Sequence, residues 1–190
     1  MKKLFLTMVA LVVAIAAGAQ SAEKLYTDGK ALYDAEKYNE AFPKLKAAAE
    51  KGHKKAQYRM GRCYDKGYGV GENDKLAFEW YMKAAKQDHA KSQYRVGKCY
   101  KDGEGVKKDR KQAVKWFTKA ASQDNADAQY ALGKCYLKGK GVATDKKKAK
   151  SLLTKAVKNP DGGDEIMAEL REEAADGDED AKAILTLIGK

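Results

Sequence analysis

The sequence has 190 residues, of which 34% are charged and only two are proline. This length suits one domain or one short array of repeats and excludes two large domains. Abundant alanine and lysine favour helices over strands, and the formal net charge of +11 points either to acidic partners or to plain solvation of helical faces.

Residues 1–19 have the composition of a secretory signal peptide. Lys2 and Lys3 form a short positive region, an apolar stretch follows over residues 4–17, and small residues end the segment. A retained membrane-spanning helix is the alternative, but the apolar run falls short of the ~20 residues that cross a bilayer. No cysteine directly follows the run to carry a lipid anchor. We therefore expect cleavage near Ala19 and an exported chain, periplasmic or extracellular, without a stable membrane anchor.

Residues 23–52 predict a short first pair of helices. Gly29 and Ala41 match positions of the later repeats, but they are 12 residues apart, whereas Gly61 and Ala77 are 16 apart. The first pair therefore resembles the repeats that follow, with a tighter connection between its two helices.

The chain then aligns with itself at an offset of 36 residues, which defines repeats at 54–89, 90–125 and 126–160. A Gln-Tyr pair, a glycine and a Cys-Tyr pair recur in each copy, followed by Gly-x-Gly-Val and then by Asn or Asp. Chance does not produce such agreement. A two-helix unit cannot bury its apolar face alone, and about three stacked copies are needed to form a common core.

The first half of each repeat predicts one helix. In the first copy Ala56, Met60, Cys63 and Tyr64 fall on one face at helical spacing. The glycine pair that begins at Gly67 ends the helix, because glycine accepts the left-handed conformation found at helix C-termini.

The second half of each repeat predicts another helix. Its cap is the recurring Asn73, Asp109 and Asp145, and Gln112 would complete a capping box with Asp109. The expected buried stripe is Ala77, Trp80, Tyr81 and Ala84 in the first copy, with Trp116 and Leu152 repeating Trp80.

Residues 161–190 form an acidic end. The run Asn-Pro-Asp-Gly-Gly at 159–163 breaks the repeat, and two further helices are expected over 164–176 and 179–189. Ten acidic and three basic residues give the segment a charge of −7, which leaves +18 on the rest of the chain. We expect an acidic helical cap. It either leaves the basic body open to acidic partners or shields that body.

The pattern Ala-x-x-x-Leu-Gly-x-x-Tyr, Gly-x-Gly-Val-x-x-Asp, Lys-Ala-x-x-Trp and Lys-Ala-Ala resembles the Sel-1-like repeat (SLR), a relative of the tetratricopeptide repeat. Residues 54–158 resemble it in three copies, and residues 23–52 resemble the shorter tetratricopeptide form. The resemblance implies an all-α, right-handed superhelical solenoid of antiparallel helix pairs that acts as an adaptor or scaffold. Leu152 departs from the pattern, which has an aromatic residue there.

Cys63, Cys99 and Cys135 occupy one position in successive repeats, where the family pattern is open. Neighbouring helices lie ~8–10 Å apart, beyond the ~7 Å between Cα atoms that a disulfide spans. We expect three buried free thiols and no disulfide, with an intermolecular disulfide or a metal site as alternatives. Secreted cysteine-rich members of the family carry paired cysteines within each repeat, and this chain lacks that arrangement.

Residues with catalytic or ligand chemistry do not stand apart from the repeat. His53 and His89 are repeat equivalents near turns, and without a third ligand they make a poor metal site. The Gly-x-Gly segments do not continue into a phosphate-binding motif. We therefore predict no catalytic residue, no metal and no cofactor.

A tyrosine is followed four residues later by Lys or Arg on the first helix of each unit. These pairs are Tyr26–Lys30, Tyr58–Arg62, Tyr94–Lys98 and Tyr130–Lys134, with Arg59 and Arg95 adding charge nearby. The spacing puts each pair on one helix face, away from the buried stripe. If the first helices line a concave groove, as the resemblance implies, these residues form a ladder that binds an acidic segment. The alternative is that each tyrosine packs against the next repeat.

The leading functional hypothesis is an exported, monomeric scaffold, not an enzyme, that binds a protein or peptide through this groove. Nucleic acid is a poor fit as a partner for an exported protein. A secreted enzyme acting on cell-wall or β-lactam-type substrates is a second hypothesis, by analogy with the cysteine-rich members. Docking of a basic surface on anionic envelope polymers is a third, and such loose binding would weaken steeply with salt.

Overall fold

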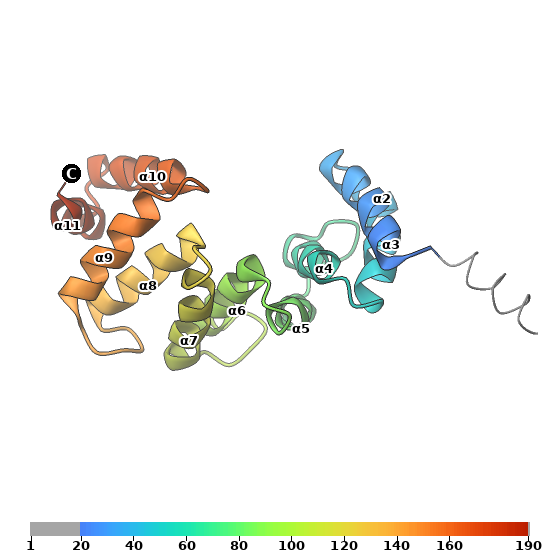
Figure 1. Ribbon diagram of the computed structural model, residues 1–190, viewed down its shortest axis with the longest axis horizontal. Coiled ribbons are helices and arrows are strands. Elements are labelled where there is room, and N and C mark those ends of the chain that lie inside the picture. Colours follow the sequence, from blue (N-terminus) through green and yellow to red (C-terminus); the bar gives the residue numbers. More distant parts are fainter. Residues whose placement is uncertain (1–19, 190) are drawn as a thin grey trace, which may run out of the picture. The chain divides into compact units, whose positions relative to one another are not determined.

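The computed structural model describes residues 20–189, so the predicted signal peptide lies outside the described part. Within that range the chain forms ten α-helices and no strand, as the sequence predicts (Figure 1). The helices are α2 (Ala22–Asp34), α3 (Tyr38–Glu50), α4 (Lys54–Lys66), α5 (Asp74–Ala85), α6 (Ala90–Asp102), α7 (Arg110–Ala121), α8 (Ala126–Lys138), α9 (Lys146–Val157), α10 (Gly163–Ala175) and α11 (Glu179–Ile188).

The chain divides into two compact units. The N-terminal unit ends at Glu72 and contains α2, α3 and α4, and the C-terminal unit begins at Asn73 and contains α5 to α11. Helices that follow each other in sequence pack together within each unit, most extensively α2 with α3, α6 with α7 and α8 with α9. These three pairs are the helical hairpins that the repeat predicts.

Small residues let the paired helices approach closely. In the N-terminal unit, a Cβ atom on Gly29 of α2 would lie 3.0 Å from the side chain of Leu45 on α3. In the C-terminal unit, a Cβ atom on Gly97 of α6 would lie 2.5 Å from the ring of Phe117 on α7. The recurring first-helix glycine is therefore the contact point of the hairpin, against which the large core side chain of the second helix packs.

Two apolar clusters form the core of the C-terminal unit. The first contains Ala113, Phe117, Leu132 and Cys135, with Tyr94 packed against its edge. The second joins α8 and α9 to the two C-terminal helices through Leu153, Ile166, Leu170 and Ile184, with Tyr130 at its edge. The acidic segment is thus attached to the last repeat by apolar contacts.

The predicted helix caps are confirmed. The side chains of Asn73, Asp109 and Asp145 accept hydrogen bonds from free amides in the first turns of α5, α7 and α9. The predicted capping box is wrong, however. The backbone N–H of Asp109, which Gln112 would have to bind, donates instead to the carbonyl of Tyr100 at 2.8 Å.

The glycine pair has two different functions. Gly67, Gly103 and Gly139 end α4, α6 and α8 in the left-handed conformation, as predicted. The second glycine also has positive φ, and it additionally meets backbone: a Cβ atom on Gly105 would lie 2.1 Å from the carbonyl oxygen of Asp74, at the start of α5. A Cβ atom on Gly141 would likewise lie 2.3 Å from the carbonyl oxygen of Arg110, at the start of α7. The second glycine therefore allows each turn to pack on the preceding repeat.

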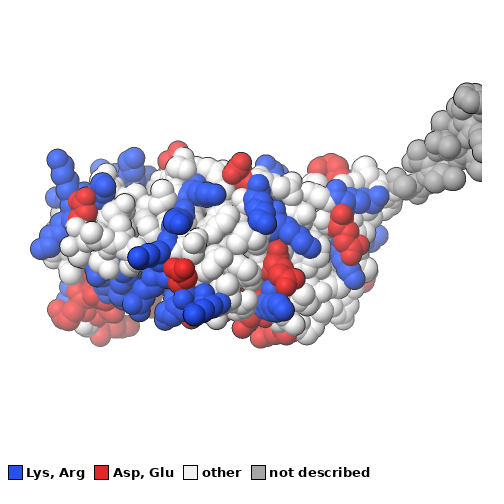
Figure 2. Space-filling model, turned by 90° about the horizontal axis from the view of Figure 1, so that it is seen from below, with Lys and Arg blue, Asp and Glu red and all other residues white. Residues whose placement is uncertain are grey.

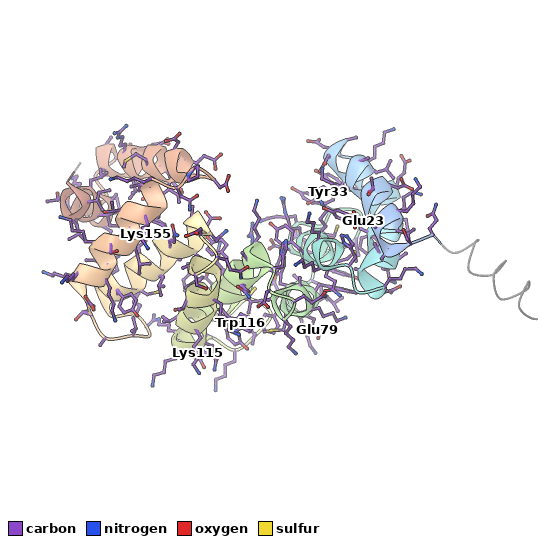
Figure 3. All side chains as sticks on the ribbon, in the orientation of Figure 1. Glu23, Tyr33, Glu79, Lys115, Trp116 and Lys155 are labelled. Atoms are coloured by element: carbon purple, nitrogen blue, oxygen red, sulfur yellow. The ribbon has the colours of Figure 1, made fainter. Side chains whose placement is uncertain are left out.

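The recurring tryptophans are not part of the fully buried stripe. Trp80 and Trp116 are half-buried, and the ammonium groups of Lys83 and Lys119 lie 3.8 and 4.5 Å from their ring centroids. On α7 the fully buried aromatic residue is the next one, Phe117. Trp116, labelled in Figure 3, therefore lies at the margin of the buried stripe, and the ammonium group of Lys119 lies over its ring.

Candidate functional site

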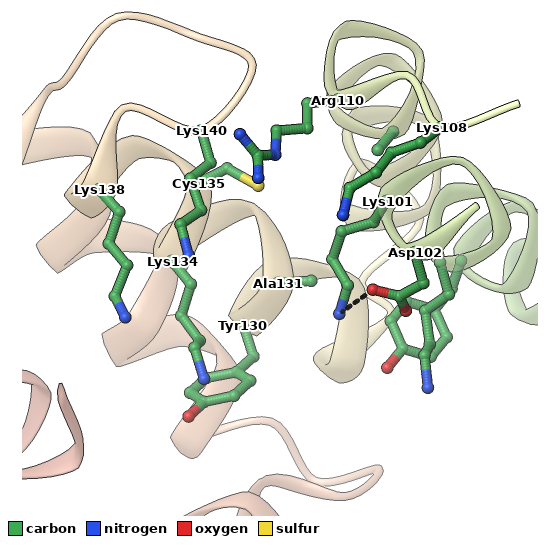
Figure 4. Close-up of a pocket in the computed structure, with 13 residues that line it drawn as sticks. Lys101, Asp102, Lys108, Arg110, Tyr130, Ala131, Lys134, Cys135, Lys138 and Lys140 are labelled. Carbon is green, nitrogen blue, oxygen red and sulfur yellow. Dashed lines mark ion pairs between the residues drawn. The ribbon is translucent and has the colours of Figure 1, made fainter. Parts of the chain in front are cut away.

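A cavity of about 460 Å³ opens among α6, α7, α8 and the turns that follow α6 and α8 in the C-terminal unit (Figure 4). Seven cationic side chains line it: Lys98, Lys101, Lys108, Arg110, Lys134, Lys138 and Lys140. Asp102 is the one acidic residue among the described residues that line it. The volume falls within the ordinary range of ligand sites.

Helical spacing and the turn length explain why these residues meet. Tyr94 and Lys98 are one turn apart on α6, and Tyr130, Lys134 and Lys138 follow one another at intervals of four residues on α8, so each set shares a face. Lys101 lies on the last turn of α6, and the turns after the two helices bring in Lys108, Lys140 and the first residue of α7, Arg110. The cavity is thus built from two successive repeats.

Two half-buried tyrosines line the cavity and contact the core as well. The ring of Tyr94 lies 5.9 Å from that of Phe117, and burial raises the pKa of Tyr94 to about 12. Burial also raises the pKa of Tyr130, and the nearby carboxylates of Glu173 and Glu169 raise it further. Tyr94 therefore packs on Phe117 of its own repeat, Tyr130 packs on the cluster that joins α8 and α9 to the C-terminal helices, and both line the cavity.

Most of the positive charge of the cavity is uncompensated. Lys101 lies 3.4 Å from Asp102, and Lys138 pairs with Asp180 of α11. The remaining five cations form no ion pair with any residue in the range 20–189, and the ammonium group of Lys134 lies 5.0 Å from the ring centroid of Tyr130. Such a concentration of ammonium and guanidinium groups attracts an anionic ligand.

Cys135 also lines the cavity, but as a neutral thiol. Burial raises its pKa, outweighing the opposite influence of Lys101 and Lys140. All three cysteines are buried, and none of them forms a disulfide within the described range. A protonated thiol is a weak nucleophile and a weak metal ligand, and among the described residues no group of three His, Cys, Asp or Glu side chains could hold a metal ion.

The remaining residues of the predicted ladder have different surroundings. Tyr26 is buried and stacks on His53 with ring centroids 4.2 Å apart, and Lys30 pairs with Asp34 on its own helix. Arg59 also pairs with Asp34, at 3.2 Å. The N-terminal pair of the ladder is therefore engaged within its own unit.

The two arginines of α4 lie over an aromatic ring. The guanidinium groups of Arg59 and Arg62 lie 4.6 and 5.8 Å from the ring centroid of Tyr33. Tyr33, labelled in Figure 3, is not among the residues predicted from the sequence to bind a partner. Tyr58 and Arg95 are half-buried and have contacts of their own. Of the ten residues predicted to bind a partner, the structure brings four to the cavity: Tyr94, Lys98, Tyr130 and Lys134.

The other cations of the cavity were missed by the sequence reading. Lys101 and Lys138 lie on the last turns of α6 and α8, while Lys108, Arg110 and Lys140 lie in or beside turns, where helical periodicity gives no orientation. A signal was available, because a basic residue stands near Gly-x-Gly-Val in successive copies. The direction in which that basic side chain points, however, depends on how the turn packs.

The two histidines cap helices. The Nδ1 atoms of His53 and His89 accept hydrogen bonds from the backbone amides of Ala56 and Ser92, at 3.1 and 3.3 Å. This is the turn-capping role that the sequence allows.

None of the described helices is long and apolar enough to cross a bilayer.

Helical hairpins of equal design, stacked through recurring glycines and alanines, define a helical-repeat protein of the tetratricopeptide-like class. The Sel1 repeat matches residues 54–89, 90–125 and 126–161, more than half of the chain, and the chain belongs to the Sel1 repeat family. Proteins of this family act as scaffolds for protein interactions and are typically not enzymes. Among curated proteins, none matches this chain.

The solved structures that are similar to it include two further proteins of this fold. A Sel1 repeat protein from Oxalobacter formigenes is 36% identical with a TM-score of 0.68, and the match covers 72% of this chain and 56% of that one. The protective antigen c5321 of uropathogenic Escherichia coli, which has an SLR fold, is 30% identical with a TM-score of 0.71, over 80% of this chain and 33% of that one. This chain therefore spans about half of the first protein and a third of the second. Both similarities confirm the predicted fold class, an all-α repeat solenoid.

Proposed function

We propose that this chain is an exported interaction scaffold that binds an acidic segment of a partner protein in the cavity among α6, α7 and α8. The observation that carries the proposal is the set of five cations in that cavity without an ion-pair partner among the described residues, beside two tyrosine rings. The scaffold role of the family supports a protein as the partner.

The tyrosines favour a protein segment over a simple anionic polymer. Tyr94 and Tyr130 are held against the core, so their exposed edges offer apolar area and a hydroxyl at little cost in side-chain entropy. A polymer that presents only repeated anions would pair with the cations but make no apolar contact with the tyrosine rings. A peptide with acidic and apolar side chains uses both.

A charge-matched pair of variants tests the cavity. The first variant replaces Lys108, Lys134 and Lys140 by glutamine. The control replaces Lys115, Lys147 and Lys150, which are exposed on α7 and α9 outside the cavity. The probe is a labelled peptide with four consecutive glutamates among neutral residues, and its glutamine counterpart is the blank. We expect the cavity variant to weaken binding roughly tenfold or more and the control to change it less than about twofold.

Two outcomes would contradict the proposal. One is the absence of binding between the glutamate peptide and the unaltered protein at low salt. The other is an equal loss of affinity in both variants, which indicates diffuse attraction of polyanions to the basic surface. Lys and Arg side chains are spread widely over one face of the molecule (Figure 2), so diffuse attraction is the competing explanation that the control must exclude.

Export is the second part of the proposal and is supported by the composition of residues 1–19. Expression of the full sequence in a Gram-negative host, followed by mass measurement of the protein in the periplasmic fraction, tests it. A mass that corresponds to a chain beginning at Gln20 is expected. Recovery of the uncleaved chain, from cytosol or membranes, would contradict it.

A further inference from the structure

The C-terminal helices place negative charge beside the basic cavity. Ile166 and Leu170 hold α10 in the same apolar cluster at whose edge Tyr130 lies. Glu169 and Glu173 follow Ile166 by three and seven residues, so they project from or beside this packed face of α10. Their influence on the pKa of Tyr130 accords with that position.

One contact joins the acidic helices to the cavity directly. The ammonium group of Lys138, which lines the cavity, forms an ion pair and hydrogen bond with a carboxylate oxygen of Asp180, in the first turn of α11. Hydrogen bonding to Lys138 and the charges of Lys138, Lys134 and Lys140 lower the pKa of Asp180. The carboxylate therefore stays ionised at neutral pH, contacts Lys138, and has a pKa that three of the cavity's seven cations lower.

A carboxylate in this position does what an acidic ligand would do. It neutralises Lys138 and adds negative potential at the end of the cavity formed by α8. An incoming acidic segment must either replace Asp180 at Lys138 or bind without that lysine. Because Asp180 is exposed and joined to Lys138 by a surface contact, replacing it requires no disruption of the core.

We propose that Asp180 is an internal competitor for the basic cavity, so that the acidic C-terminal helices lower the affinity of the site and an acidic partner segment displaces Asp180 from Lys138. This inference rests on the proposed function, because it concerns the same cavity and the same class of ligand. The C-terminal cap would then make binding selective, because weakly acidic segments fail to displace Asp180 and densely acidic segments succeed.

Asp180→Asn is the central variant of the test, and the probe is the glutamate peptide described above. We expect it to bind the variant roughly two- to fivefold more tightly, a gain typical of removing one exposed competing charge. Glu172→Gln is the matched control. It removes one negative charge from an exposed site on α10 that has no contact with the cavity lysines among the described residues, and we expect no change.

A double-mutant cycle separates direct competition from a general change of charge. If Asp180 acts through Lys138, Asp180→Asn has a smaller effect in a Lys138→Gln background than in the unaltered protein. Thermal unfolding of each variant verifies that α11 remains packed. Equal or weaker peptide binding by Asp180→Asn, an equal gain in the Glu172→Gln control, or the same gain with and without Lys138 would overturn the inference. Failure of the proposed function is distinguishable, because the peptide then binds neither the unaltered protein nor any variant.

Discussion

The side-chain amide of Gln123 donates a hydrogen bond to the buried side-chain carbonyl of Gln93 at 2.7 Å. Gln93 is 1% exposed, and its own amide group donates to the carbonyl of Ala85 and to the carboxylate of Asp88, both at 3.2 Å. One buried side chain therefore joins the end of α5, the turn that follows α5 and the turn that follows α7. Part of this arrangement recurs at Gln129, whose side-chain amide donates to the carboxylate of Asp124 and whose side-chain carbonyl accepts from Asn159.

Replacement of Gln93 by leucine is therefore expected to destabilise the protein despite the greater hydrophobicity of leucine. The carbonyl of Ala85 and the amide of Gln123 lose their partner, at about 1–3 kcal/mol for the buried group. Urea unfolding followed by circular dichroism measures the loss. Gln123→Leu is the control, since Gln123 is exposed and water can replace it as a donor, and we expect a smaller effect. Equal stability of Gln93→Leu and the unaltered protein would show that the network contributes nothing.

Gly105→Ala is expected to be strongly destabilising. Gly105 has φ of +67°, and an added Cβ atom would lie 2.1 Å from the backbone oxygen of Asp74. Backbone strain of this kind costs about 1–3 kcal/mol, and the contact with rigid backbone adds to it. Gly71→Ala provides the comparison, because nothing lies within 4 Å of the Cβ position at Gly71 and its φ is not in the left-handed region. Thermal unfolding should show a lower transition temperature for the first variant only, and similar transitions for both would refute the argument.

The glycine pair illustrates what local sequence can predict. The first glycine was predicted from a local rule, the left-handed end of a helix, and Gly103 confirms it. The second glycine, Gly105, is required because its backbone packs against that of Asp74, a residue about one repeat earlier in the chain. No local pattern contains that contact, because it depends on how one hairpin stacks on the next.

The candidate site shows the same limit. Equivalent residues of a repeat have equal backbone positions but unequal neighbours, so the four Tyr–cation pairs do not share one environment. Tyr26 is covered by His53, whereas Tyr94 and Tyr130 retain an edge on the cavity. The repeat period identifies the Tyr–cation positions, but the residues packed around each position determine which contacts its side chain makes.

The three thiols are expected to react slowly in the native protein. Burial raises the pKa of the Cys63 thiol to about 11 and also raises that of Cys135. With a pKa of 11, about one Cys63 thiol in a thousand is ionised at pH 8, compared with about one in ten for a thiol with the ordinary pKa of 9.0. Iodoacetamide labelling followed by mass spectrometry should therefore modify all three cysteines readily in urea and very slowly without it. Rapid labelling of Cys135 in the native state would mean that the cavity exposes its thiolate.

Buried phenols predict how stability changes in alkali. The pKa of Tyr94 and that of Tyr33 are each raised from 10.0 to about 12, so the folded protein holds these protons more firmly than the unfolded chain. The resulting stability is fully present below pH 10 and is lost as the pH rises from 10 towards 12, because only the unfolded chain ionises freely in that interval. Urea unfolding at several pH values between 8 and 11.5 should show this decline. Tyr94→Phe removes one of the phenols with a raised pKa without removing its ring, so its decline should be shallower while stability at neutral pH stays close to that of the unaltered protein. An equally steep decline in Tyr94→Phe would mean that the alkaline loss arises from other groups, such as the lysines that lose their charge above pH 10.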